Sequence, residues 1–369
     1  MVAIGAAYPT TAYTTYGQTP SSATAATSSS ASASAAASPA DSAATSVTLS
    51  SAAQAALAVK DFATVLSEAR SKLTALLIEA GRTSPLKDDK LAVDLSGLDQ
   101  RELFAMASDD SFSADEQAAA GLEMQHRFEA AMAGPAGVAQ VTGNFTALYK
   151  AAATYLDSLG PEEKAGADWI AGRAAITEGL KQLATNPKTM PETSEADPVQ
   201  LYLALVNAGG AQQQDIADIA AGARKSLDTL YADAIKAGKA PTFNKNTIAG
   251  TYIDLSGLPS RTLSAIALNT GEQFSTAEVD EAKAALRTKS GAALLAGFQN
   301  AAKSSDPTAF SQNIISIFSS MSAEERQAAG WSDNFYAAAV QSYESTSKLT
   351  QMFAEAGGDS TGFMSWMGK

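Results

Sequence analysis

Small and apolar side chains recur at spacings of three and four residues along the segment from residue 62 to residue 80. The positions that make this pattern are Phe62, Leu66, Ala69, Leu73, Leu76, Leu77 and Ala80. Such spacing is typical of a helix that buries one face. Gly81 and Pro85 follow the pattern, and they predict that the helix ends there.

The same pattern returns 154 residues later, in a segment that begins at Ile216. Its positions are Ile216, Ala220, Ala223, Leu227, Leu230, Tyr231 and Ala234. The correspondence continues at an offset of 160 between 93–98 and 253–258, and at an offset of 162 between Trp169 and Trp331. Because the offset grows only by steps the size of a loop, we interpret the chain as a head-to-tail duplication, which constrains the whole architecture.

Both copies are expected to contain the same series of elements. A long helix is followed by a short extended piece, at 91–95 in the first copy and at 251–255 in the second. A short helix comes next, with Ser96 or Ser256 as its expected N-cap. The aspartate two residues before each serine is expected to fix the turn through bonds to backbone amides. Further helices complete the copy, and the glycines at 134–137 predict a break among them.

The predicted fold class is therefore all-α, with two tandem copies of a helical unit of about 160 residues and at most short extended pieces. A disordered tail rich in Ser, Ala and Thr is expected before them, because its only charged residue is Asp41 and it has little apolar surface to bury. The predicted boundaries are 1–49 for this leader, 50–196 for the first repeat, 197–356 for the second repeat and 357–369 for an apolar C-terminal tail.

Composition narrows the range of functions. The formal net charge of −13 argues against a nucleic-acid partner, because binding to phosphates needs clustered Lys and Arg. No apolar run approaches the ~18 residues that would indicate a membrane span. The chain has no Cys, so it forms no disulfide and offers no thiolate to a metal.

Two loops, 105–116 and 267–278, end in the manner of a calcium-binding EF-hand loop, with an apolar residue, a serine and a glutamate three residues later. Both lack a carboxylate at the first ligand position, which holds Ala105 or Ala267. Weak calcium binding by these degenerate loops is the alternative hypothesis for function. The candidate ligands are Asp109, Asp110, Glu116, Asn269 and Glu278.

A capping box explains the same serines and glutamates without any metal. In this motif the serine side chain accepts a bond from the glutamate amide, and the glutamate side chain accepts one from the serine amide. Ser113 with Glu116, and Ser275 with Glu278, have the required spacing. Both explanations place a helix directly after the loop.

No group of residues indicates a catalytic site, so we expect that the protein is not an enzyme. His126 is the only histidine, and it falls within a helical pattern without a partnered nucleophile. The pair Glu162 and Glu163 is adjacent in a first helical turn, where anions complement the helix dipole. No catalytic or cofactor-binding residue is predicted.

The leading hypothesis is a non-enzymatic structural or interaction protein that assembles with itself or with a protein partner. Phe363, Trp366 and Met367 in the C-terminal tail are the candidate interaction residues, because apolar anchors of this kind dominate interfaces. In composition the leader is similar to the polar, uncleaved starts of proteins exported by flagellar or type III routes. Residues 1–59 contain no Lys or Arg, so two locations stay open: export without a cleaved secretory signal, or the cytoplasm.

Overall fold

A computed structural model describes residues 60–208 and 215–357 of the chain. Within these ranges there are 13 α-helices and only four strands, each of two or three residues, which confirms the all-α class with short extended pieces. The predicted leader, and the predicted tail apart from Gly357, lie outside the described residues. In these ranges no helix is both long and apolar enough to cross a membrane.

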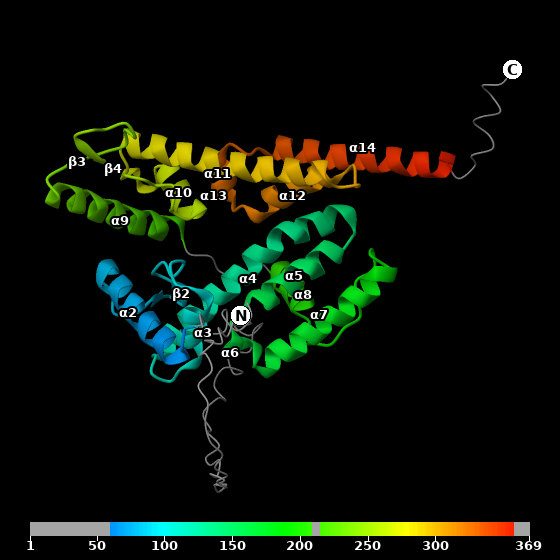
Figure 1. Cartoon of the computed structure of the whole chain (residues 1–369), viewed down its shortest axis with the longest axis horizontal. Helices are drawn as coiled ribbons and strands as arrows, with labels where there is room; N and C mark the ends of the chain where they lie inside the picture. Colours follow the sequence, from blue (N-terminus) through cyan, green and yellow to red (C-terminus); the bar gives the residue numbers. More distant parts are fainter. Residues whose placement is uncertain (1–59, 209–214, 358–369) are drawn as a thin grey trace, which may run out of the picture.

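The first half of the chain contains a long helix, a two-stranded hairpin and then a series of helices (Figure 1). The strands pair antiparallel, with Leu86 opposite Leu91. The elements are α2 (Phe62–Ala80), β1 (Leu86–Lys87), β2 (Lys90–Leu91), α3 (Gln100–Ser108), α4 (Ala114–Thr142), α5 (Thr146–Ser158), α6 (Pro161–Lys164), α7 (Ala167–Thr185) and α8 (Pro198–Asn207).

The second half repeats this order, except that no described element follows its last helix in the place of α8. Its two strands pair in parallel rather than as a hairpin, with Pro241 opposite Thr251. The elements are α9 (Ile216–Lys236), β3 (Ala240–Thr242), β4 (Gly250–Tyr252), α10 (Ser260–Ala267), the 3₁₀ turn η1 (Thr270–Glu272), α11 (Thr276–Ala302), α12 (Ala309–Ser320), α13 (Ala323–Ala329) and α14 (Asp333–Gly357).

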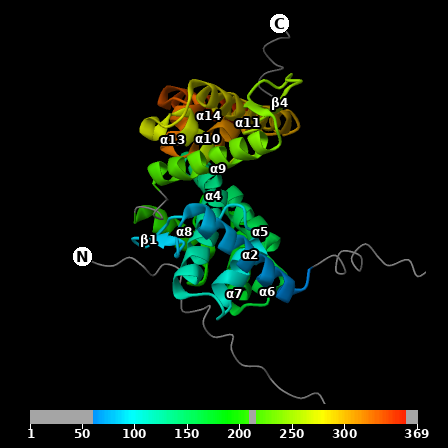
Figure 2. The same ribbon diagram turned by 90° about the vertical axis from the view of Figure 1, so that its left-hand side faces the viewer.

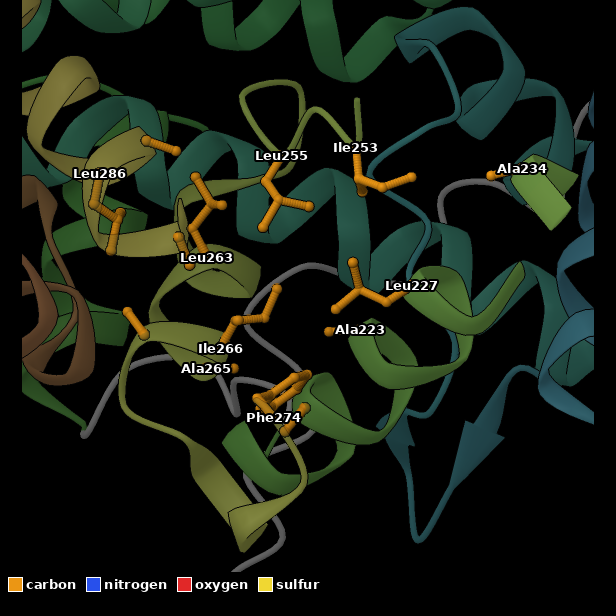
Figure 3. Packing of buried hydrophobic residues seen from close by; sticks show 14 residues of the cluster. Ala223, Leu227, Ala234, Ile253, Leu255, Leu263, Ala265, Ile266, Phe274 and Leu286 are labelled. Carbon is orange, nitrogen blue, oxygen red and sulfur yellow. The ribbon is translucent and has the colours of Figure 1, made fainter. Parts of the chain in front are cut away.

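Residues that correspond in sequence are buried in corresponding cores. Figure 3 shows the core of the second half, where side chains of α9, α10 and the segment after β4 converge. Seven of the buried residues in this cluster have buried counterparts in the core formed by α2, α3 and the start of α4. The buried pairs are Ala69 and Ala223, Leu73 and Leu227, Val93 and Ile253, Leu95 and Leu255, Leu103 and Leu263, Met106 and Ile266, and Phe112 and Phe274.

The two tryptophans that correspond in sequence also lie against corresponding helices. The indole nitrogen of Trp169 donates to the carbonyl oxygen of Leu156, 2.8 Å away, at the end of α5. The ring of Trp331 lies 6.5 Å from the ring of Phe318, at the end of α12. Leu156 and Phe318 are themselves 162 residues apart, the offset of the tryptophans. A packing role therefore accounts for both tryptophans.

Helix α4 lies between the two halves and contacts both (Figures 1 and 2). The break predicted at 134–137 is wrong, because α4 continues without interruption through Pro135. Gly134 and Gly137 instead face α12, where a Cβ at Gly137 would stand 2.0 Å from the hydroxyl oxygen of Ser319. The glycines allow two helix backbones to approach closely, and this packing compensates for the hydrogen bond that a proline cannot make.

Helix α8 begins directly after the predicted boundary at 196/197 and packs on the first half. Val199 and Tyr202 are buried in the cluster that α5 and α7 form. Its N-cap is Asp197, which is fully buried and accepts bonds from the amides of Val199 and Gln200 and from the hydroxyl of Tyr149. By packing, α8 thus completes the core of the first half.

The predicted N-caps of the short helices are wrong, whereas the predicted turns are present. Asp94 Oδ1 accepts a bond from the Ser96 amide at 2.9 Å, and Asp254 makes the same bond with Ser256. These turns displace each helix start by a few residues. The N-cap of α3 is Asp99, which forms a complete capping box with Glu102, and α10 follows Pro259.

One difference between the copies leaves a buried carboxyl group without a strong partner. In α13, Ser322 forms a capping box with Glu325. The corresponding glutamate in α6, Glu163, follows Gly160, which has no hydroxyl to offer. Among the described residues one oxygen of Glu163 has no hydrogen-bond partner, and Gln100 lies 3.5 Å from the other. Burial therefore raises the pKa of Glu163 to about 7.

We expect Glu163→Gln to stabilise the protein at pH 8 by about 2–3 kcal/mol. At this pH the folded wild type must keep a charged carboxylate in a buried site, whereas the glutamine side chain is neutral. A raised pKa in the folded state means that wild-type stability falls as the pH rises from 4.5, the ordinary value, to about 7. Urea unfolding at pH 4 and pH 8 measures the effect. The two proteins should be close in stability at pH 4, and parallel pH profiles would contradict the argument.

Candidate functional site

The first EF-like loop is held by a capping box and an arginine. The carboxylate of Glu116 accepts a bond from the Ser113 amide at 2.7 Å, and the Ser113 hydroxyl accepts one from the Glu116 amide. Arg70 of α2 donates to both carboxylate oxygens of Glu116, at 3.1 and 3.0 Å. The same guanidinium lies 3.7 Å from the ring centroid of Phe112. Both oxygens of the proposed calcium ligand thus have protein donors.

The second loop repeats this arrangement with its glutamate more deeply buried. Glu278 is only 2% exposed. Its carboxylate accepts bonds from the Ser275 amide at 2.6 Å, from the hydroxyl of Tyr231 at 2.6 Å and from Arg224 at 2.8 Å. Burial alone would raise the pKa of Glu278, but the bonds from Tyr231, Ser275 and Arg224 outweigh it and lower the pKa.

The other candidate ligands bond to the backbone of the loops. Asp109 accepts a bond from the Ser111 amide, and Asn269, at a φ of 50°, accepts one from the Phe274 amide. Asp110 is exposed. In the ranges 60–208 and 215–357, no three His, Cys, Asp or Glu residues are grouped so that they could hold a metal ion. The arrangement fits helix capping better than calcium coordination.

We therefore expect millimolar calcium to leave the midpoint of thermal unfolding unchanged relative to a chelator. A ligand that binds only the folded state at 100 times its dissociation constant would stabilise it by about 2.7 kcal/mol. Magnesium serves as the control for a general effect of divalent salt. A rise of several degrees with calcium alone would show that the loops open and bind the ion.

The only histidine is part of a small ionic group on α4. Nδ1 of His126 lies 3.7 Å from a carboxylate oxygen of Glu123, which also pairs with Arg127 at 2.8 Å. Arg127 in turn donates to the carbonyl oxygen of Leu98 before α3. The group therefore joins α4 to the segment that precedes α3.

Large apolar side chains are exposed at the free end of the second half, where α11 ends, α12 begins and α14 continues (Figure 1). The rings of Phe298 and Phe310 meet edge to face at 5.8 Å. We call this set the end surface. Its members are Leu295, Phe298, Phe310, Leu349, Met352 and Phe353.

The α14 part of the end surface lies beyond the start of α12. Ser342 of α14 bonds to Ser311 of α12 at 3.0 Å, although Ser342 is itself exposed. Leu349 and Phe353 follow Ser342 by 7 and 11 residues, which places them within about 20° of its direction around the helix. Since α12 begins only at Ala309, α14 extends past it (Figure 1). Leu349 and Phe353 are exposed there.

The corresponding end of the first half is covered. Leu148 is fully buried in the cluster that includes Val199 and Tyr202 of α8, whereas its counterpart Phe310, 162 residues later, is 38% exposed. The ring of Tyr202 also meets Phe128 of α4 at 6.3 Å. At Phe310, therefore, the described part of the second half has no helix in the place that α8 takes in the first half.

The predicted interaction residues Phe363, Trp366 and Met367 lie outside the described residues. The end surface was not predicted, because the periodicity of apolar residues in α11, α12 and α14 indicates a helix without saying whether a neighbour covers it. One signal was present in the sequence. The first copy continues past the predicted boundary at 196/197 into the segment that forms α8.

Comparison of the chain with known protein families, with curated proteins and with solved structures finds no match in any of the three. The end surface is therefore the feature of the molecule from which we infer a function.

Proposed function

We propose that this chain is a non-enzymatic interaction protein that assembles with itself or with a protein partner through the end surface. The observation that carries the proposal is the exposure of six large apolar side chains on three adjacent helices, where the first half is covered by α8. Exposed apolar side chains that cluster, as Phe298 and Phe310 do, are typical of sites where proteins bind one another. Aromatic anchors such as Phe298 are the residues that contribute most to such interfaces.

The chemistry of the end surface fits a helical partner. In the first half, α8 covers the corresponding position by inserting Val199 and Tyr202, which are three residues apart on one helix face. The other sides of the end surface carry neutral polar residues of α14, among them Thr350 and Gln351. An amphipathic helix with two or three apolar anchors is therefore the class of partner that we propose.

Phe298→Lys tests the proposal, with Ile170→Lys as its matched control. Phe298 and Ile170 are 58% and 57% exposed, so the two changes cost the isolated chain about the same, but only Phe298 belongs to the end surface. We expect the mass from light scattering to rise above 37.8 kDa with concentration for the wild type and for Ile170→Lys, and to stay at 37.8 kDa for Phe298→Lys.

A partner other than the chain itself is tested by quantitative cross-linking in the native source with the same two variants. The cross-linked partner should be lost with Phe298→Lys and kept with Ile170→Lys. A wild-type chain that is monomeric at every concentration, together with a set of cross-linked proteins that Phe298→Lys does not alter, would contradict the proposal.

A further inference from the structure

We propose that pH controls the attachment of α6 to α3: α6 is docked while the carboxyl group of Glu163 keeps its proton, and it detaches locally when that proton is lost (Figure 1). The end surface and its partner play no part in this device. Three features of the first half carry the proposal: what α6 buries, why its glutamate has no cap, and which charges surround it.

The side chain that α6 buries is a titratable one. Of the four residues Pro161–Lys164, Glu163 alone is buried in the described part of the chain. One of its oxygens is the unpartnered atom noted above, and the other lies 3.5 Å from the amide nitrogen of Gln100 on α3. Burial of a charged group is far more costly than burial of the neutral acid. Since α6 buries no apolar side chain, its attachment depends directly on the protonation state of Glu163.

The missing cap has a steric cause. The second copy caps its glutamate, Glu325, with Ser322, and Gly160 stands in the place of this serine. A Cβ at Gly160 would lie 2.7 Å from Cγ of Arg101. Arg101 is held in this position by Glu162, whose Oε2 accepts a bond from the arginine Nε at 3.0 Å. A serine cap and this position of the arginine therefore exclude each other.

The second copy has the opposite arrangement. Its glutamate is capped, and Nε of Arg261, the counterpart of Arg101, is buried without a hydrogen-bond partner within 60–208 and 215–357. The first copy thus pairs the arginine and leaves the glutamate uncapped, whereas the second copy caps the glutamate. A response through the buried glutamate is therefore a property of α6 and not of α13.

The charges around Glu163 leave a carboxylate there without a strong partner. The charged groups on α3, α5, α6 and α7 pair with one another or with α2, as Arg101 with Glu162, Lys72 with Glu102, and Asp157 with Arg173. Asp99, before α3, and Asp168, at the start of α7, are negative and would repel a carboxylate. Lys164 attracts it, but burial outweighs this attraction, and the ammonium group donates to the carbonyl oxygen of Asp157 at 2.6 Å.

The direction of the response follows from the two states. The pKa of Glu163 is about 7 when α6 is docked and returns to its ordinary value of 4.5 when the side chain reaches water. Attachment is therefore strongest below pH 4.5 and weakens as the pH rises to about 7. The ratio of detached to docked α6 should rise roughly tenfold per pH unit between these values and level off above them. Detachment separates Arg101 from Glu162, so neutral pH uncovers the first turn of α3.

Native-state amide hydrogen exchange of the full chain between pH 5 and pH 8 tests the proposal. The reporters are the amides of Lys164, Ala165 and Gly166, which bond to carbonyl oxygens of residues 160–163. A single turn is unstable once it leaves its support, so detachment allows these amides to exchange. Their protection, corrected for the intrinsic pH dependence of exchange, should fall roughly tenfold per pH unit up to about 7. Glu163→Gln should abolish this fall.

Low concentrations of urea distinguish local detachment from unfolding of the whole protein. The urea dependence of exchange scales with the surface that an opening exposes. The α6 amides should therefore be nearly insensitive to urea. The amide of Tyr149, which bonds to the carbonyl oxygen of Phe145 and starts the buried face of α5, should be sensitive to it.

Glu162→Gln is the matched control, because it removes the neighbouring carboxylate of the same helix. Arg101 lowers the pKa of Glu162, so this group stays charged throughout the range tested. The variant should lower the protection of the α6 amides by about fivefold or less at every pH and keep its pH dependence. The amide of Arg326 in α13 is the control within the wild type, and its protection should not follow that of α6.

Two results would overturn the proposal. One is protection of the α6 amides that stays constant with pH in the wild type, or that keeps its pH dependence in Glu163→Gln. The other is exchange of the α6 amides with the same urea dependence as Tyr149, which would link the proton to unfolding of the whole first half.

Discussion

Gly137→Ala is expected to destabilise the protein by about 2–3 kcal/mol, although alanine is the better helix former. A Cβ at this position of α4 would stand 2.0 Å from the hydroxyl oxygen and 2.3 Å from the Cβ of Ser319 on α12. No real contact is that short, so α4 and α12 must separate. Overpacking usually costs about 1–3 kcal/mol and occasionally more, so for a contact this short we expect about 3–4 kcal/mol, from which the better helix propensity of alanine subtracts about 1 kcal/mol. Urea unfolding measures the loss.

Gly121→Ala on the same helix is the matched control. A Cβ there meets no atom within 4 Å, so this variant should be stabilised by about 0.5–1 kcal/mol. Ser319→Gly should rescue Gly137→Ala, because the added Cβ then meets only the Cα of residue 319, 3.8 Å away. If Gly137→Ala behaves like Gly121→Ala, or if Ser319→Gly gives no recovery, α4 and α12 are not in contact in solution.

The sequence alone predicts the helices that form the two corresponding cores, and the reason is local. Residues spaced like Ala69 and Leu73 are buried together when the segment is a helix with one inward face. Their repetition at Ala223 and Leu227 argues that this spacing did not arise by chance. The capping boxes are equally local, since Ser113 and Glu116 are three residues apart. These features need no knowledge of the rest of the fold.

The contact between the halves is not local, and the prediction made from the sequence is wrong there. Glycine and proline together usually end a helix, so a break at 134–137 was the expected outcome. The glycines instead face Ser316 and Ser319, more than 170 residues further along the chain. Only a three-dimensional arrangement shows that they serve a close approach of two helices.

The candidate site is unpredictable for a related reason. Phe310 and Leu148 occupy corresponding positions in corresponding helices, and both are apolar. Leu148 is buried in a cluster to which α8 contributes Val199 and Tyr202, whereas Phe310 is exposed and no described helix takes the place of α8 in the second half. A periodic pattern of apolar residues indicates that one face of a helix is suited to burial. Which neighbouring element covers that face depends on the whole fold.

Arg224→Met is expected to cost about 3 kcal/mol at pH 7, and the matched change Arg70→Met in the other copy about 1 kcal/mol. Both arginines pair with the glutamate of a capping box, and Arg224 also pairs with the exposed carboxylate of Asp228, which contributes little. The environments differ: the side chain of Glu278 is 3% exposed and that of Glu116 is 13% exposed. Removing the partner of a buried charge costs about 3–5 kcal/mol, whereas a partly exposed pair contributes about 1 kcal/mol or less.

The acid range separates this electrostatic loss from a loss of packing. Arg224 is one of the groups that lower the pKa of Glu278 below its ordinary value of 4.5. A lowered pKa means that the stabilisation is present above 4.5 and is lost as the pH falls through the folded-state pKa. The difference between wild type and Arg224→Met should therefore shrink as the pH falls and Glu278 takes up a proton. A difference of constant size through the acid range, measured by urea unfolding, would assign the effect to the contact of Arg224 with Phe274 and Tyr231 instead.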